Sequence, residues 1–218
     1  MVCMYTTMDL IKTLMSGAGV TIQVLIYSAI LAGVLSFIVG FMKLANYRLI
    51  RYIANIYIEV FRGTSLLVQL FWLYFALPLL GVELSAMTAG VLALGLNYGA
   101  YGAEVVRSSI QAVPKQQLEA AIALNMTVKQ KYQIVILPQA IRMMIPTFGN
   151  LLIELLKGTA LVSLVTLSDL TFQAMTLITS TMQTTKIFLL LLLFYFIIAF
   201  PLTRVMKWLE RKYTIGKV

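Results

Sequence analysis

Five long apolar runs constrain the fold of this chain more than any motif does. A helix needs roughly 20 residues to cross the hydrocarbon core of a bilayer. The runs cover about residues 19–42, 56–80, 87–106, 144–167 and 187–206. Because 61% of the residues are apolar and the mean hydropathy is +0.92, an ordinary soluble domain is excluded. We predict an all-α integral membrane protein with five transmembrane helices, and no linker divides residues 1–218 into more than one domain.

Lysine and arginine residues gather on one side of the predicted membrane. The segments after the first, third and fifth runs hold thirteen of them, whereas the other side holds only Lys12 and Lys186. Cytoplasmic loops carry such an excess, so the N-terminus is predicted outside and the C-terminus in the cytoplasm. The same bias explains the net charge of +9 without a nucleic-acid partner. The thirteen residues are Lys43, Arg48, Arg51, Arg107, Lys115, Lys129, Lys131, Arg142, Arg204, Lys207, Arg211, Lys212 and Lys217.

Several kinds of chemistry are excluded by composition. The chain has no histidine, which removes histidine-based metal sites, proton relays and catalytic triads. Its one cysteine, Cys3, cannot form an internal disulfide. No phosphate loop of the Gly-x-x-x-x-Gly-Lys-[Ser/Thr] kind is present. We therefore expect no catalytic residue, no metal site and no cofactor bound by this chain. No basic segment precedes the first run, so we expect a retained helix and no cleaved signal.

Three acid–base pairs lie inside or at the end of the apolar runs. Each pair is three residues apart and so shares one helix face, which reduces the cost of a lone charge in the bilayer, about 2.5–3.5 kcal/mol. Structural pairing or snorkelling near the interface is the alternative, favoured for Arg107. Glycines in the third run suit close helix packing, and Asn97, Tyr98 and Tyr101 suit a polar path. The candidate path or gate residues are Glu59, Arg62, Glu104, Glu154 and Lys157.

A short internal echo links the second and fourth runs. "EVFRGTSLLV" begins at Glu59 and "ELLKGTALVS" begins at Glu154, so that glutamate, a base, glycine and threonine recur in the same order. Internal repeats around a central path are common in transporters. Because both runs are predicted to pass from inside to outside, the two segments would have the same orientation.

The loop of about residues 107–142 is charged and yet rich in helix formers. "VPKQQLEAAIALNM" predicts a short helix that starts near Pro114, and "VKQKYQIVIL" predicts a second helical stretch leading to Pro138. Such an amphipathic helix lies on the membrane, packs on its own bundle or binds a groove on a partner.

The sequence "EAAIALNMTVKQKYQIVILPQA" resembles the EAA loop of the membrane subunits of ABC importers. That pattern is Glu-Ala-Ala, three residues, glycine, nine residues and Ile-x-Leu-Pro; here Asn125 replaces the glycine and Val135 the isoleucine. "VFRGTSLLVQLF", "GAYGAEVVRSSIQAVPKQQLEAA" and "LLIELLKGTALVSLV" are similar to the polar amino acid branch, over most of residues 55–175. Departures from that branch are Ser65 for proline, Gln116 for glycine, and Gly158 and Ala160 for aspartate and serine.

The resemblance implies a type I ABC importer permease fold in a bacterial inner membrane, with a coupling helix between spans three and four. It implies a dimer of ATPase subunits that uses ATP and Mg, a second permease subunit, identical or homologous, and an external solute-binding protein. Asparagine tolerates the left-handed conformation that glycine would supply, so Asn125 is a mild departure. The residues expected at the ATPase are Glu119, Ala120, Ala121, Asn125 and Pro138.

The finer resemblance is to permeases of ectoine and hydroxyectoine importers, through "EAAIALNM", "VFRGTSLLVQLFW" and "LLIELLKGTALVSLVTLSDLTF". It implies a zwitterionic solute that is chemically close to an amino acid. Two other interpretations stay open on the residues alone. One is an ion-coupled secondary carrier of a small polar solute, and the other is a membrane anchor for a cytoplasmic partner.

Overall fold

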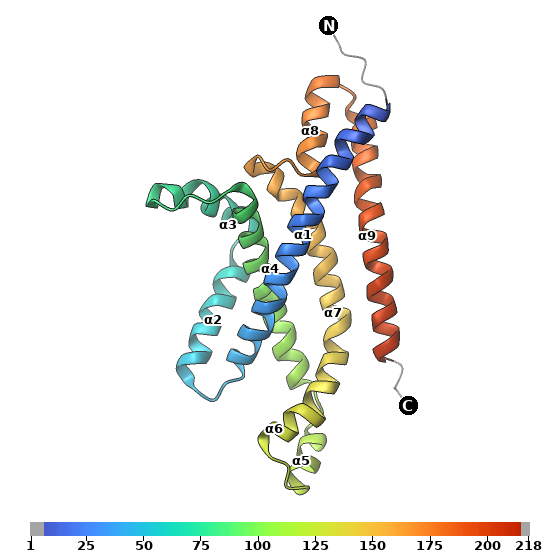
Figure 1. Cartoon of the computed structure of the whole chain (residues 1–218). Helices are drawn as coiled ribbons and strands as arrows, with labels where there is room; N and C mark the ends of the chain where they lie inside the picture. The colour runs from blue at the N-terminus through green and yellow to red at the C-terminus, as the bar shows by residue number, and fades with distance from the viewer. Residues whose placement is uncertain (1–6, 215–218) are drawn as a thin grey trace.

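The computed structural model describes residues 7–214, and Cys3 and Lys217 lie outside this range. Within it almost every residue is helical (Figure 1). The α-helices are α1 (Thr7–Lys43), α2 (Arg48–Gly63), α3 (Leu66–Phe71), α4 (Ala86–Gln111), α5 (Lys115–Ala123), α6 (Val128–Gln130), α7 (Leu137–Gly158), α8 (Leu170–Thr181) and α9 (Thr184–Thr214). Tighter or wider helical turns are η1 (Trp72–Ala76), η2 (Leu77–Leu80), η3 (Lys131–Ile136) and η4 (Thr159–Val165).

Three helical segments of residues 7–214 are long and apolar enough to cross a membrane: Thr7–Lys43, Val128–Val165 and Thr184–Tyr213. A fourth is obtained if α2 and the helical turns after it count as one broken span. These contain the predicted runs 19–42 and 187–206, and all but the last two residues of the run 144–167. The predicted run 87–106 lies in α4, whose glycines, asparagine and tyrosines lower its hydropathy. Five spans therefore remain a prediction, whereas the all-helical membrane fold is observed.

The predicted run 56–80 is not one continuous helix. α2 ends at Gly63, α3 begins at Leu66, and the two segments meet at an angle of 102°. The intervening Thr64 and Ser65 have extended backbones. A break inside a membrane needs other partners for the freed backbone groups. Here the amides of Gln69 and Asn97 both donate to the Phe61 carbonyl, at 2.9 and 2.8 Å.

α1 and α4 form the central packed pair of the fold, and glycines allow their close approach. A Cβ built on Gly95 would lie 2.5 Å from Leu31 Cδ2, and one on Gly40 would lie 2.7 Å from Val106 Cβ. Ser36 faces Gly102, and its hydroxyl donates to the Ala32 carbonyl at 2.6 Å. The glycine stripe of the third run therefore serves helix packing.

α8 was not predicted from the sequence, and Asp169 begins it. The Asp169 side chain caps α8 by accepting from the backbone N–H groups of Phe172 and Thr171, at 2.9 and 3.3 Å. Next to it, the Leu170 N–H donates to Thr21 Oγ1 of α1 at 3.0 Å. The cap residue is fully buried, so it joins α8 to α1 inside the molecule.

Burial raises the pKa of Asp169 from 3.8 to about 6. Asp169 therefore contributes most to the free energy of unfolding below pH 3.8. This contribution, on the order of 3 kcal/mol, is lost as the pH rises through 6. We expect the melting temperature of the detergent-solubilised protein to fall between about pH 4 and 7, where the folded state keeps a proton that the unfolded state has lost. Asp169→Asn keeps the cap and should remove most of this fall. With no histidine in the chain, equal pH slopes for the two proteins would contradict this account.

Candidate functional site

The helix α5 projects at one end of the molecule, beyond the bundle and opposite α8 (Figure 1). It follows Pro114, which stands at the N-cap position, and it packs against η3. The predicted helix over 113–126 is thus confirmed, with slightly narrower bounds. The second helical stretch is confirmed as α6 and η3, which run directly into α7.

Asn125 closes α5 in the left-handed conformation that the sequence predicts for it. Its φ is +53°, its N–H donates to the Ile122 carbonyl at 2.9 Å, and the Met126 N–H donates to the Ala121 carbonyl at 3.1 Å. These two bonds form a Schellman motif, which satisfies the last carbonyls of a helix. Thr127 then begins α6 with a capping box. The loop is therefore built from two helix ends with a fixed turn between them.

The exposed surface of α5 combines one carboxylate with apolar side chains. Glu119 and Ala120 are exposed, and Ile122 and Leu124 are 53% and 71% exposed. Ala121 is only 2% exposed, so its small size serves packing within this chain. A helix that presents apolar side chains around an acid, away from its own bundle, is suited to bind a partner groove. Pro138 lies further along the loop, at the start of α7.

Asn125 gives a test of the turn that ends α5. Asn125→Gly should leave function intact, because glycine adopts positive φ without a Cβ clash. Asn125→Val should strain the turn by about 1–2 kcal/mol and lower the transport rate of the assembled system about tenfold. Initial rates of solute uptake measure both variants. A valine variant with the native rate would show that the turn geometry is not used.

A charged groove lies between α1, α2 and α4, at the end of the molecule nearer α5. It has a volume of about 390 Å³, within the range of ligand pockets, and it is open to the surface. Glu59, Arg62 and Glu104 of the predicted path residues line it. Lys43 and Tyr101 complete its polar wall.

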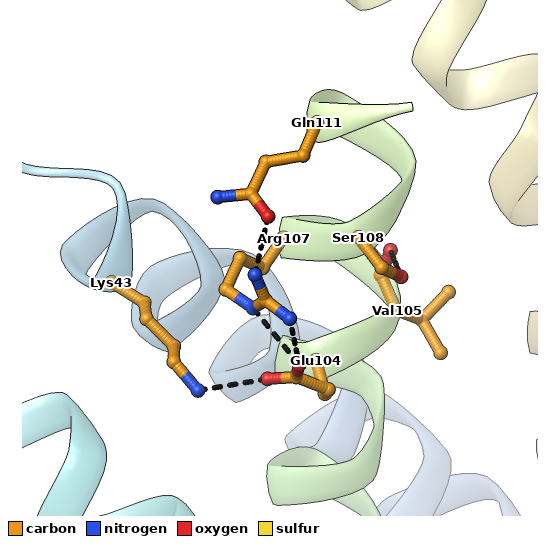
Figure 2. Close-up of polar contacts among 6 residues, drawn as sticks. All are labelled: Lys43, Glu104, Val105, Arg107, Ser108 and Gln111. Atoms are coloured by element: carbon orange, nitrogen blue, oxygen red, sulfur yellow. Dashed lines mark hydrogen bonds and ion pairs between the residues drawn. The ribbon is translucent and has the colours of Figure 1, made fainter. Parts of the chain in front are cut away.

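Glu104 is the centre of an ion-pair network in this groove (Figure 2). Lys43 Nζ, at the end of α1, lies 2.9 Å from Glu104 Oε2. Arg107 binds Glu104 Oε1 from the next turn of α4, with its Nε at 2.9 Å, and also donates to Gln111. The predicted Glu104–Arg107 pair is thus confirmed. The sequence identifies Lys43 only as a loop cation, because a partner 61 residues away leaves no local pattern.

The other two acid–base pairs form no ion pair within residues 7–214, although each lies on one helix. The Arg62 guanidinium instead lies 5.0 Å from the centre of the Tyr101 ring, a cation–π contact. Glu154 and Lys157 are exposed on α7 and do not line the groove. Asn97, suggested for a polar path, is buried and bonded to Phe61 and Gln69 at the helix break.

Two tyrosines of α4 connect the groove to the charged turn of α7. The Tyr101 ring lies 6.5 Å from the Tyr98 ring, and the Tyr98 hydroxyl donates to the Glu154 backbone carbonyl at 2.9 Å. The path residues therefore lie in two groups, on α2 with α4 and on α7, joined by aromatic side chains. The arrangement offers both signs of charge and aromatic faces, and within residues 7–214 there is no cluster of metal-ligating side chains.

Comparison with known proteins identifies the family. Residues 29–215 match the family described as binding-protein-dependent transport system inner membrane component. The chain is 50% identical to a probable amino-acid ABC transporter permease protein, y4tF, of Sinorhizobium fredii, over 94% of this chain and 89% of that one. It is 34% identical to the arginine transport system permease protein ArtQ of Bacillus subtilis, over 94% of both chains.

Solved structures agree. A crystal structure of an amino acid ABC transporter with histidines superposes with a TM-score of 0.89 at 34% identity, covering 95% of this chain and 99% of that one. The inward-facing MetNI methionine ABC transporter shares the fold, with a TM-score of 0.73 at 20% identity over 93% and 98% of the two chains. This chain therefore belongs to the inner membrane components of binding-protein-dependent transport systems: it has the type I ABC importer fold and is a non-catalytic, multi-pass permease subunit of the bacterial inner membrane.

Proposed function

We propose that this chain is the permease of an ATP-driven importer for polar amino acids or a related zwitterionic solute such as ectoine. Its relatives supply the solute class, since they are named for amino acids in general and for arginine. The observation that carries the mechanism is α5, an exposed helix with Glu119 at one end of the bundle. The single domain over residues 1–218 would alternate between inward- and outward-facing states.

α5 is the proposed contact with the ATPase. Glu119 would meet a basic residue there, Ala120 would let the helix sit close, and Asn125 and Pro138 would fix the ends of the loop. Ala121 would act indirectly, by holding α5 against the rest of the loop. ATP with Mg would be bound and hydrolysed by a dimer of ATPase subunits, and preferential ATP binding to one state would shift the population of the permease.

The proposed topology has five spans, with the N-terminus outside and the C-terminus in the cytoplasm. The basic C-terminal turns of α9, the end of α1 and α5 all lie toward the same end of the molecule (Figure 1), which supports this orientation. Two permease subunits, identical or homologous, would enclose the path, and an external solute-binding protein would deliver solute at the end of α8.

The proposed solute path follows the two charged groups of the site. Arg62 and Lys157 offer cations for a solute carboxylate, while Glu59, Glu104 and Glu154 offer carboxylates for its positive group. A zwitterion needs both signs of charge, or helix-end dipoles, close by. Glu104 is already bound by two bases, Lys43 and Arg107. Its role would therefore be to hold α1 against α4 near the gate.

Lys157 tests this path. Lys157→Met should lower solute uptake by about 10–100-fold, because a hydrogen bond to a charged group contributes about 1.5–3 kcal/mol. Lys186→Met, which removes an exposed cation at the start of α9, outside the proposed path, is the matched control and should keep the native rate. Initial uptake rates at several solute concentrations measure the effect. An unchanged rate and solute preference in the Lys157 variant would remove it from the path.

The solute class is tested by uptake competition in cells that express the complete system. Radiolabelled arginine, glutamine, cystine and ectoine are offered singly and as competitors. We expect one or more to enter, with vanadate sensitivity and indifference to an uncoupler while ATP is maintained. Uptake that an uncoupler abolishes at constant ATP would favour an ion-coupled carrier and contradict the proposal.

A further inference from the structure

The C-terminal half of α9 carries a stripe of cations and one tryptophan on a single helix face. Arg204, Lys207, Trp208, Arg211 and Lys212 are spaced by three or four residues along this face, and all are exposed. Such spacing places them one above another on the helix surface. Within residues 7–214 none of these cations has a carboxylate partner. The charges of this stripe are therefore available to a ligand outside the chain.

The stripe lies on the side of α9 away from α7, with Lys207 at its edge. On the opposite side of α9, Met206 packs on α7, since a Cβ built on Gly149 would lie 3.1 Å from its Cε, and Leu202 joins the core there. Glu210, the acid of this segment, lies in the hollow that Met206 and Gly149 line, and Lys207 borders the same hollow. The outward face of this segment is thus basic, whereas Glu210 lies toward α7.

The same outward face is apolar in the preceding turns. Leu193, Ile197 and Phe200 lie on it and are 49%, 55% and 48% exposed. The change from apolar to basic occurs within one turn, where the Arg204 guanidinium lies 5.1 Å from the centre of the Phe200 ring. Further along, Lys212 Nζ lies 5.0 Å from the centre of the Trp208 ring. Tryptophan at such a boundary is typical of the headgroup layer of a membrane.

We propose that this face of α9, from Arg204 to Lys212, binds the phosphate headgroups of anionic phospholipids. The apolar turns would contact the acyl chains, Trp208 would lie among the headgroups, and the four cations would meet the phosphates. Basic residues directly beyond a membrane helix bind anionic leaflets in this way, each with about a fivefold gain in affinity. The proposal concerns the lipid around the permease and does not depend on the identity of the solute.

The test uses the full chain in detergent, with whatever subunits co-purify, and measures the rise in melting temperature on adding dioleoyl phosphatidylglycerol or phosphatidylcholine. Phosphatidylglycerol should stabilise the native protein, whereas phosphatidylcholine should not. The stabilisation by phosphatidylglycerol should be smaller at high salt. Arg204→Gln with Arg211→Gln should need about 25-fold more of this lipid. The matched control, Lys12→Gln with Lys186→Gln, removes two cations at the other end and should shift the midpoint less than about twofold.

Two further arms separate the proposal from its rivals. Arg204→Lys with Arg211→Lys keeps the charges and should respond like the native chain; failure to do so would contradict a charge-based site. Glycerol phosphate, which lacks acyl chains, should not stabilise the protein at the same concentration, and an equal effect would overturn a lipid site. Three results for the variant with Arg204→Gln and Arg211→Gln would also overturn the proposal. The variant could keep the native response to phosphatidylglycerol, or lose no more of that response than the control does. It could also lose only a co-purified ATPase.

Discussion

Glu119→Lys is expected to abolish co-purification of an ATPase subunit with this permease. Glu119 is exposed on α5 and forms no ion pair within residues 7–214, so its carboxylate is free for a partner. Reversing its sign would place like charges together and lose a charged hydrogen bond, at a cost of about 2–5 kcal/mol. That corresponds to a loss of about 30-fold to more than about 1,000-fold in affinity. Gentle solubilisation, affinity purification and quantification of the ATPase measure it.

A matched reversal separates this effect from a general disturbance of the chain. Glu83 is also an exposed glutamate, in the segment between η2 and α4 and away from α5. Glu83→Lys should keep the ATPase at native stoichiometry, and Glu119→Gln should give an intermediate loss. If Glu119→Lys retains the ATPase as well as Glu83→Lys does, α5 is not the coupling helix.

Gly102→Ala is expected to destabilise the helix bundle strongly, through the contact between α1 and α4. A Cβ at this position would overlap the Ser36 hydroxyl, and it would lie 2.8 Å from Ser36 Cβ and 3.1 Å from a Phe148 ring carbon. Overpacking of this kind typically costs about 1–3 kcal/mol. Because α1 and α4 are the central pair, we expect a lower melting temperature and a lower yield of folded protein in detergent.

Two further variants make the glycine result specific. Gly33→Ala adds the same methyl group to α1 where nothing lies within 4 Å, so it should be neutral or gain up to about 1 kcal/mol of helix propensity. Ser36→Gly combined with Gly102→Ala moves the small residue to the partner helix and should recover part of the loss. Equal melting temperatures for Gly102→Ala and Gly33→Ala would show that the α1–α4 contact is not tight.

The structure of the loop over residues 107–142 could be predicted from the sequence because its signals are local. Helix formers and Pro114 fix α5, and the tolerance of asparagine for positive φ, seen at +53°, fixes the turn at Asn125. The internal echo between the second and fourth runs also marks helix ends. α2 ends at Gly63 and α7 ends at Gly158, which are matching positions of the echo. Local sequence therefore encodes where helices end.

The rest of the site depends on partners that are distant in sequence. The helix break at Thr64 and Ser65 is held by Asn97, 36 residues from the Phe61 carbonyl it binds, and an apolar run gives no sign of it. The Lys43–Glu104 pair likewise joins two helices. The spacing of Glu59 and Arg62 predicted a pair on one face, but the nearby Tyr101 ring gave Arg62 another contact. Helix periodicity identifies shared faces and cannot choose among tertiary partners.

The most direct test of the central claim is solute uptake by proteoliposomes reconstituted with and without the ATPase subunits. An ATP-driven permease predicts uptake only when the ATPase is present, Mg-ATP is supplied on the side of α5, and the loaded solute-binding protein is supplied on the side of α8. Glu119→Lys should abolish that uptake, whereas Glu83→Lys should not. Uptake by this chain alone, driven by an ion gradient and indifferent to ATP, would contradict the account.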